Sequence, residues 1–321
     1  MNIIQWAEEY LLSNGFTLTG QPEHVRTMPW SSVTRFNTST GYIYLKQTPP
    51  ALSLEPVITQ ILYDQFHASV PVVISANKEL HCFLMKNAGD PLRDLFKDGF
   101  QADLLCLAIK EYTFIQHATP EHINIFLELG VPDWRLEKLP SLYDELTSKE
   151  DLLIADGMRT DELNTLYKLR PTFLRLCQHL SSYKLPETLD HCDFHDNNIL
   201  IENGTHNITI IDLGETVITH PFFSLITCLR NARFRYSIKE TDKIYIQLQD
   251  ACFKNWITLA KKNDLLSAFS LAEKLWPIYA TLGEYRLMIS SHAEEFKSLD
   301  RRGRLTEGLK EFIAKRGQYE S

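Results

Sequence analysis

The sequence predicts an α+β fold, in which a small strand-rich part precedes a longer helical part. Two β-rich runs, residues 32–36 and 42–46, flank a short polar turn and indicate a hairpin. From about residue 100 the apolar residues recur at helical spacing. A short polar stretch, residues 86–91, separates the two patterns. We therefore expect a small lobe over residues 1–86 and a large lobe over residues 87–321.

The small lobe alternates between helix and strand signals along its length. An apolar stripe that begins at Ile3 and ends at Leu11 has helical spacing and predicts a first helix. After the hairpin, a helix is expected over residues 55–66. Two further strands are expected over residues 70–74 and 80–85. Together these signals predict a small antiparallel sheet with helices beside it.

The large lobe carries apolar faces typical of packed helices, the first over residues 104–115. Thr119, Thr160 and Thr241 are expected to cap the amino-terminal ends of further helices, because threonine oxygens accept hydrogen bonds from free backbone N–H groups. Pro171 lies inside a helical pattern, where its ring and its missing N–H should break or kink the helix.

One β-rich segment interrupts the helical lobe. Residues 199–202 and 207–212 read as strands joined by an Asn-Gly turn, so Asn198 and Asp212 should lie side by side at the ends of a hairpin. An amide oxygen beside a carboxylate suits Mg²⁺, which takes substrate phosphates as its other ligands. Asp193, five residues before Asn198, is then available as a general base toward a hydroxyl. This arrangement is typical of phosphoryl transfer.

Composition excludes several classes of protein. There are 33 Lys and Arg residues against 41 Asp and Glu residues, which gives a formal net charge of −8 and no basic footprint for nucleic acid. No run approaches the roughly 18 apolar residues of a membrane span. The amino terminus has acids where a secretory signal has basic residues, and the six cysteines form no CxxC pair. We expect a cytoplasmic protein that binds neither nucleic acid nor membrane.

The polar residues around the hairpin resemble a known pattern. His191, Asp193 and Asn198, followed after the hairpin by an Asp-x-Gly run that begins at Asp212, resemble the catalytic and metal-binding loops of kinases. The run HCDFHDNN resembles the HGDLHPGN of the aminoglycoside phosphotransferase and choline kinase family, and residues 130–135 look like another segment common in it. The resemblance spans most of the chain and implies a bilobal protein-kinase-like fold, with a small antiparallel sheet in the N-lobe and a mainly helical C-lobe.

The resemblance also implies a nucleotide site with ATP in the cleft. Lys46 stands at the end of a strand, where the family has its phosphate-binding lysine. Glu55 would pair with that lysine and orient it, although an acid in a first helical turn is favoured in any case. The adenine would lie against the backbone near Met85 and Asn87, with Mg²⁺ on the hairpin pair.

The catalytic and acceptor residues follow from the same resemblance. Asp193 would orient and deprotonate the acceptor hydroxyl, and His195 would contact the γ-phosphate or else be an ordinary surface histidine. Glu215 would reach the metal or a cationic substrate, or be solvated. The acceptor is expected to be a small hydroxylated and cationic metabolite or an aminoglycoside-like compound. Candidate acceptor residues, with helix packing as the alternative, are Arg230, Trp276, Tyr279, Glu284 and Tyr285.

Two departures from the family pattern bear on these expectations. No G-x-G occurs, so a Rossmann site and a Walker A loop are excluded and residues 37–41 are expected to form the phosphate loop. Ser224 stands where the family usually has an aspartate that braces the catalytic loop, which bears on the efficiency of catalysis. It leaves open a pseudokinase that binds nucleotide without turnover, although Lys46, Asp193 and the hairpin pair are all present.

A zinc-dependent hydrolase is the alternative from another chemical class. His191, Asp193 and His195 form a dense cluster, and His220 or His292 would complete a zinc shell. Zinc hydrolysis needs neither the strand-end lysine nor the hairpin pair, whereas phosphoryl transfer needs both. The sequence therefore favours an ATP- and Mg²⁺-dependent phosphotransferase.

Overall fold

The computed structural model describes most of the chain, and its residues form two compact units. The described residues are 2–202, 204–291, 296, 299 and 301–319. Unit 1 comprises Met1–Leu95, Asn197–Gly214 and Leu287–Leu299. Unit 2 comprises Phe96–Asp196, Glu215–Arg286 and Asp300–Ser321. The lobe boundary near residue 86 stays a prediction. None of the helices in these described ranges is both long and apolar enough to cross a membrane.

An antiparallel sheet with the strand order β1-β2-β3-β5-β4 is the centre of unit 1. The predicted hairpin is confirmed, because β2 pairs with β3 and Val33 lies opposite Lys46. The first strand was not predicted, since its residues are mostly polar and exposed. The strands are β1 (Glu23–Met28), β2 (Ser31–Thr38), β3 (Gly41–Gln47), β4 (Val73–Asn77) and β5 (Cys82–Lys86).

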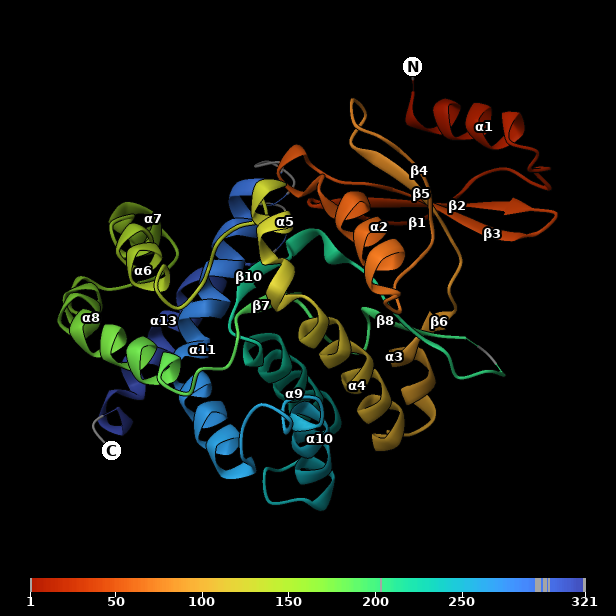
Figure 1. Ribbon diagram of the computed structural model, residues 1–321. Coiled ribbons are helices and arrows are strands. Elements are labelled where there is room, and N and C mark those ends of the chain that lie inside the picture. Colours follow the sequence, from red (N-terminus) through yellow and green to blue (C-terminus); the bar gives the residue numbers. More distant parts are fainter. Residues whose placement is uncertain (1, 203, 292–295, 297–298, 300, 320–321) are drawn as a thin grey trace. The chain divides into compact units, whose positions relative to one another are not determined.

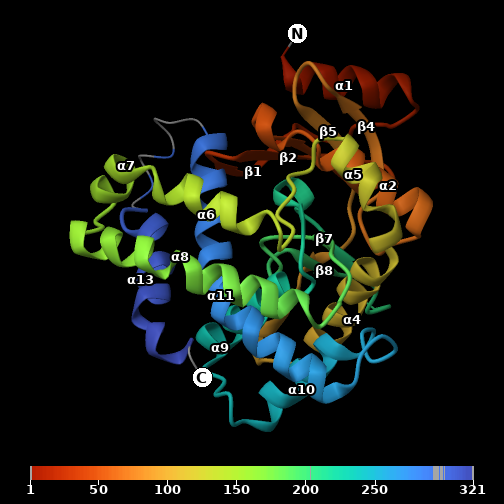
Figure 2. The same ribbon diagram turned by 60° about the vertical axis from the view of Figure 1, so that its left-hand side comes forward.

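The two faces of this sheet have different neighbours. Helix α1 (Ile3–Ser13) buries Ala7 and Leu11 against one face, in a core with Ile43 and Leu45. Side chains alternate along a strand, so Lys46 points to the opposite face, where it contacts the first residue of α2 (Glu55–Phe66). Figures 1 and 2 show both helices beside the sheet. The predictions of both helices are confirmed.

The predicted second hairpin is also confirmed and belongs to unit 1. Strands β8 (Ile199–Ile201) and β9 (Ile208–Ile210) pair with Ile199 opposite Ile210, and β6 (Asp90–Pro91) adds to β8. The N–H of Ile211 donates to the carbonyl of Asn198 at 3.0 Å, so the strand ends are adjacent as the turn chemistry requires. Asn203 of the expected turn lies outside the described residues. Helix α3 (Leu92–Leu95) follows β6.

Unit 2 is mainly helical around one small sheet, in which β7 (Thr188–Asp190) pairs antiparallel with β10 (Val217–Thr219). Helix α4 packs against α10 and β7, and α8 packs against α6 and α13. The helices are α4 (Ala102–Ala118), α5 (Ile123–Glu128), α6 (Leu139–Thr147), α7 (Glu150–Ala155), α8 (Thr160–Ser181), α9 (Phe222–Tyr236), α10 (Lys243–Phe253), α11 (Lys262–Ser290, in this unit through Arg286) and α13 (Arg304–Ala314).

One of the three predicted threonine caps is correct in position, and the other two are wrong. Thr119 is the cap residue of the short helix Pro120–His122, but its hydroxyl does not cap that helix. It bonds back to the carbonyl of Ile115 at 3.2 Å, a competing arrangement that serine and threonine often adopt at helix ends. Helix α8 starts at Thr160 itself, because the N–H of the preceding Arg159 is satisfied by the Glu162 carboxylate. Helix α10 starts after Asp242 rather than Thr241.

Pro171 does not break its helix, whereas a kink at this residue stays a prediction. Helix α8 continues through this proline to Ser181. Phe173 and Cys177 bury the face of the helix that follows the proline, and this tertiary packing holds the helix together.

Candidate functional site

A buried lysine lies at the centre of the cluster in unit 1. Lys46, 5% exposed at the end of β3, donates a hydrogen bond to Glu55 Oε1 at 2.8 Å and lies 2.7 Å from Oε2. The same Nζ lies 2.5 Å from Asp212 Oδ1. An ammonium group can be buried only where opposite charges and acceptors replace its water. The end of a strand, the start of a helix and the end of a hairpin therefore meet at one cation.

The charges of this cluster depend on one another. Burial acts to lower the pKa of Lys46, but the carboxylates of Asp212 and Glu55 outweigh it, so the pKa of the lysine is raised. Burial raises the pKa of Glu55, and the Lys46 ammonium acts against that shift. The lysine is therefore firmly cationic, which is what binding a phosphate group requires.

A cavity of about 400 Å³ within unit 1 brings together most of the nucleotide-site residues predicted from the sequence. Lys46, Glu55, Asn198 and Asp212 line it, and so does Met85. Asn87 does not line the cavity. Its side chain accepts a hydrogen bond from Gly89 N–H at 3.3 Å within its own turn. The residues on either side of Asn87, at positions 86 and 88, do line the cavity.

The lining of the cavity is partly apolar. Val33, Tyr44, Pro71, Leu200 and Ile211 contribute to it, and Tyr44 lies opposite Met85 in the β3–β5 register. Ligand pockets of this kind combine apolar walls with a few fixed polar groups. The apolar side chains suit a flat heteroaromatic ring, and the lysine and the hairpin residues suit phosphates.

One glycine is required in the wall of the cavity, and a second packs closely against a residue that lines it. Gly89 has a φ of +114°, and a Cβ there would lie 2.2 Å from the carbonyl oxygen of Ile201. A Cβ on Gly214 would lie 3.3 Å from Glu55 Oε2, so the Asp-Leu-Gly run packs tightly against that carboxylate. Asp212 itself has a left-handed φ of +68°, which asparagine and aspartate tolerate better than most residues.

The expected phosphate loop is placed wrongly by the sequence analysis. Residues 37–41 comprise the turn between β2 and β3 and the strand ends on either side of it, and none of them lines the cavity. Arg26 and Ser31, on either side of the turn between β1 and β2, do line it. The register of β1 shifts between His24 and Arg26, as at a β-bulge, and bulges re-aim side chains. Arg26 is thus a further cation at the cavity in addition to the two lysines that line it. The sequence analysis missed it because β1 lacks an apolar pattern.

The hairpin ends carry the donor set of a hard cation. The side chain of Asp212 is 38% exposed, whereas Asn198 is only 4% exposed. One carboxylate and one amide oxygen at adjacent positions fit Mg²⁺, which keeps several ligands from water or phosphate. These two residues would hold the metal ion if it binds here.

The Asp193 segment belongs to unit 2. Asp193 has a side chain that is 45% exposed, and its Oδ2 lies 3.3 Å from His195 Nε2. His191 is buried; its Nδ1 accepts the N–H of Asp193 at 3.3 Å and its ring lies against Phe194. Asp196 is 5% exposed and accepts a hydrogen bond from the Tyr236 hydroxyl. The segment therefore presents one carboxylate to solvent, with a histidine beside it.

The zinc alternative loses its ligand set. Within the described ranges, no group of three or more His, Cys, Asp and Glu side chains is arranged to hold a metal ion. His220 is fully buried, its Nδ1 accepts the N–H of Phe222 at 3.3 Å, and burial lowers its pKa to about 3. His292 lies outside the described residues.

The proposed acceptor residues of the helical part make contacts within the protein. The Arg230 guanidinium binds both oxygens of Glu311, at 2.8 and 3.0 Å, and lies 4.0 Å above the ring of Trp276. Glu284 pairs with Arg301. These contacts agree with the helix-packing alternative for these side chains.

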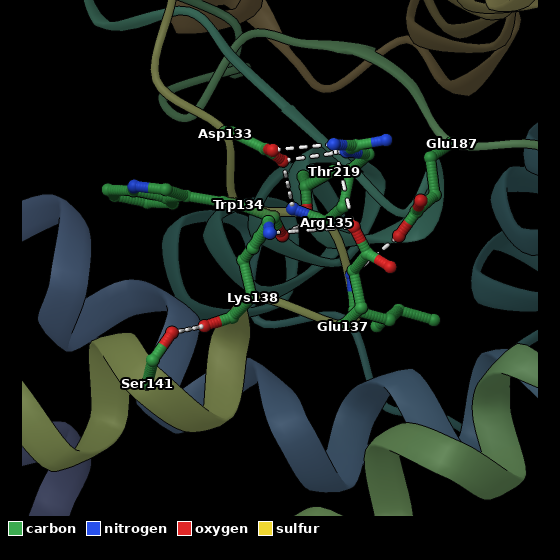
Figure 3. A network of polar contacts seen from close by, with 9 residues as sticks. Asp133, Trp134, Arg135, Glu137, Lys138, Ser141, Glu187 and Thr219 are labelled. Carbon is green, nitrogen blue, oxygen red and sulfur yellow. Dashed lines mark hydrogen bonds and ion pairs between the residues drawn. The ribbon is translucent and has the colours of Figure 1, made fainter.

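A polar network anchors the segment that follows α5 (Figure 3). Arg135 donates to both oxygens of Asp133, at 2.7 and 2.8 Å. The Trp134 carbonyl accepts the hydroxyl of Thr219 at 2.7 Å, and the Leu136 N–H donates to Glu187 at 2.5 Å. These bonds tie the segment to β10 and to the chain before β7. Its residues therefore have a structural role.

The family comparison agrees with this geometry. A family model described as the phosphotransferase enzyme family (APH) matches residues 78–255, which is more than half of the chain and includes the Asp193 loop and the hairpin. The chain belongs to this phosphotransferase family. A comparison with curated protein sequences gives no significant match.

Solved structures of this phosphotransferase type share the fold. The ethanolamine kinase of Plasmodium vivax has a TM-score of 0.64 at 14% identity, covering 97% of this chain and 86% of that one. The GDP complex of aminoglycoside 2'-phosphotransferase-IIIa has a TM-score of 0.62 at 15% identity, covering 98% and 100%. The choline kinase LicA of Streptococcus pneumoniae has a TM-score of 0.60 at 10% identity, covering 96% and 98%. The phosphotransferase therefore has the predicted protein-kinase-like fold, with an antiparallel sheet in its amino-terminal part and a helical carboxyl-terminal part.

Proposed function

We propose that this phosphotransferase moves the γ-phosphoryl group of ATP to a hydroxyl group of a small cationic acceptor, with Mg²⁺ as the metal ion. One observation carries the proposal: the buried Lys46 is held between Glu55 and Asp212 at a cavity that Asn198 also lines. A cation fixed beside a hard-oxygen metal site is the arrangement that phosphoryl transfer requires, because positioning and charge neutralisation dominate this reaction.

The nucleotide would occupy the cavity of unit 1. The apolar side chains around Met85 would take the base, and Lys46 and Arg26 would contact the phosphates. Asn198 and Asp212 would hold the Mg²⁺ ion, which neutralises charge on the phosphates when bound. The GDP complex among the related structures supports a nucleotide ligand, so ATP and GTP are both to be tested as donors.

The acceptor chemistry depends on Asp193. Its exposed carboxylate would orient the acceptor hydroxyl and take its proton, and the nearby His195 would contact the transferred phosphate. An ethanolamine kinase, a choline kinase and an aminoglycoside phosphotransferase are among the similar structures, and their named substrates are hydroxylated and cationic. This likeness supports a small cationic alcohol as acceptor. We place the reaction in the cytoplasm, where ATP is available.

The proposal is tested by measuring nucleoside diphosphate release over a panel of acceptors. The purified chain is assayed with ATP or GTP, with and without Mg²⁺, on aminoglycosides, choline, ethanolamine and homoserine. We expect Mg²⁺-dependent release with at least one acceptor. The Asp193→Asn variant should abolish that release while nucleotide affinity stays within about twofold. Nucleotide binding without turnover on any acceptor would instead show a pseudokinase, and equal turnover in the variant would exclude Asp193 as the base.

A further inference from the structure

The backbone just before Asp193 has an unfavourable conformation. Cys192 has a φ of +67°, in the left-handed region that residues with a Cβ rarely adopt. Such a conformation persists only where the surroundings hold it in place. The Cys192 N–H donates to Ser224 Oγ at 2.9 Å and to Asp190 Oδ1 at 3.2 Å. The Cys192 N–H, directly before the proposed base, is thus shared by two acceptors, one from β7 and one from α9.

The neighbouring backbone N–H groups are also held. The N–H of His191 donates to the Tyr112 hydroxyl at 2.9 Å, and the N–H of Asp193 donates to His191 Nδ1 at 3.3 Å. The ring of Tyr112 stacks on Phe194 with the ring centroids 4.2 Å apart. The backbone N–H groups of residues 191–193 are therefore all held by hydrogen bonds. Two of their partners, Tyr112 and Ser224, in turn donate to the same carboxylate.

That carboxylate is Asp190, which is fully buried. It accepts the hydroxyl of Ser224 at 2.6 Å, the N–H of Ser224 at 3.2 Å, the hydroxyl of Tyr112 at 3.4 Å and the hydroxyl of Tyr279. Burial raises the pKa of Asp190, and the hydrogen bonds from Ser224 and Tyr279 act against that shift. A buried carboxylate with this many donors is fixed in position, because every displacement would leave a polar group unpaired.

We propose that Asp190 is a positioning residue for the phosphoryl transfer, holding the Cys192 N–H together with Ser224 so that the Asp193 carboxylate keeps its orientation. This inference rests on the proposed function, in which Asp193 takes the acceptor proton. Asp190 itself acts only through the backbone. Position 224 carries a hydroxyl where the family usually has an aspartate, and the negative charge of this contact comes from β7 instead. Asp190 and Ser224 together thus hold the catalytic loop, and we call this pair the brace.

Moving the carboxylate from position 190 to position 224 tests the inference. We expect Asp190→Asn to lower kcat by about 10²-fold, since small displacements of a reacting group have effects of this size, with nucleotide Kd unchanged. Ser224→Asp alone should also lower kcat, because two carboxylates would then meet in a buried site. In the Asp190→Asn background the same Ser224→Asp change should raise kcat to within about threefold of the wild type. General destabilisation would not make Ser224→Asp lower kcat in the wild type and raise it in the Asp190→Asn background.

Two further variants guard against effects of folding. Thr188→Val removes another buried hydroxyl from β7, one that lies 2.7 Å from the Thr119 hydroxyl, and should lower thermal stability without changing kcat. Tyr279→Phe removes a single donor to Asp190 and serves if Asp190→Asn does not fold. It should lower kcat by about tenfold with nucleotide Kd unchanged.

Hydrogen exchange gives a readout that does not depend on turnover. Protection of the Cys192 amide should fall in Asp190→Asn and return in the double variant. Additive losses of kcat in the double variant, or unchanged kcat and protection in Asp190→Asn, would overturn the positioning role. If the wild type turns over no acceptor, the proposed function fails, and the brace is then judged by the exchange result alone.

Discussion

Lys46 and Asp212 are 166 positions apart in the chain, yet the lysine Nζ lies 2.5 Å from the aspartate Oδ1. The two carboxylates around the lysine differ in exposure, with Glu55 at 4% and Asp212 at 38% of the side chain. Glu55 is closed off from the solvent that could replace the lysine, and we propose that the more exposed Asp212 exchanges the lysine for a metal ion. On this proposal the two acids have separate roles, one structural and one in ligand binding.

Removing the lysine should destabilise the fold through Glu55. Lys46→Met leaves a buried carboxylate without its cation, so we expect the free energy of unfolding to fall by about 3–5 kcal/mol. Adding Glu55→Gln to this variant should restore most of that loss. Urea denaturation of both variants measures the difference.

The exposed partner provides the control for this experiment. Asp212→Asn leaves the Lys46–Glu55 pair in place, and its change in unfolding free energy should stay below about 1 kcal/mol. A loss as large as that of Lys46→Met would show that the two carboxylates stabilise the lysine equally.

Asn198 should set the Mg²⁺ requirement. Asn198→Ala removes one of the two proposed metal-binding oxygens. The Mg²⁺ concentration that gives half-maximal nucleotide binding should therefore rise by at least about tenfold. Binding is measured by titration calorimetry over a range of Mg²⁺ concentrations. Asn207→Ala is the matched control, since Asn207 lies on the same hairpin but donates to the exposed Glu202. If both variants respond alike, Asn198 is not a metal ligand.

Arg26 should contribute to binding the phosphates. Arg26→Ala should weaken ATP binding by about three- to tenfold and leave adenosine binding unchanged, and the ATP difference should shrink in high salt. Arg35→Ala is the matched control, because Arg35 belongs to the same sheet but pairs with Glu23 and does not line the cavity. Equal losses of ATP and adenosine affinity would mean that Arg26 shapes the cavity without contacting phosphate.

Local patterns in the sequence predicted the elements that carry their own signals. The Asn-Gly turn and the alternating strands identified the hairpin that ends at Asp212. Lys46 was identified by the family resemblance, because it stands at the strand end where the family has its phosphate-binding lysine. Strand β1 was not predicted because its exposed polar residues show no alternation of apolar and polar side chains, and Arg26 was missed with it. The predicted capping bonds from threonine side chains do not form, because several neighbouring groups compete for the same backbone N–H groups at the start of a helix.

The brace around Asp190 was beyond sequence reasoning for a different reason. Ser224 was recognised as a departure from the family pattern, but the carboxylate that compensates for it, Asp190, is 34 positions away in the chain. Tyr279, a further donor to that carboxylate, is 89 positions from Asp190. No local spacing encodes such a contact. Tertiary packing alone brings the carboxylate, the hydroxyls and the strained Cys192 together.

Acid should destabilise the fold through His220. Burial lowers its pKa from 6.5 to about 3, so below 6.5 the unfolded chain binds a proton that the folded chain does not. The free energy of unfolding should therefore fall with pH by about 1.4 kcal/mol per unit, a loss of about 2 kcal/mol at about pH 5. His220→Asn keeps an acceptor for the Phe222 N–H but does not titrate, so its urea denaturation should lose that much less stability between neutral pH and about pH 5. Parallel losses in the wild type and the variant would show that other groups set the acid response.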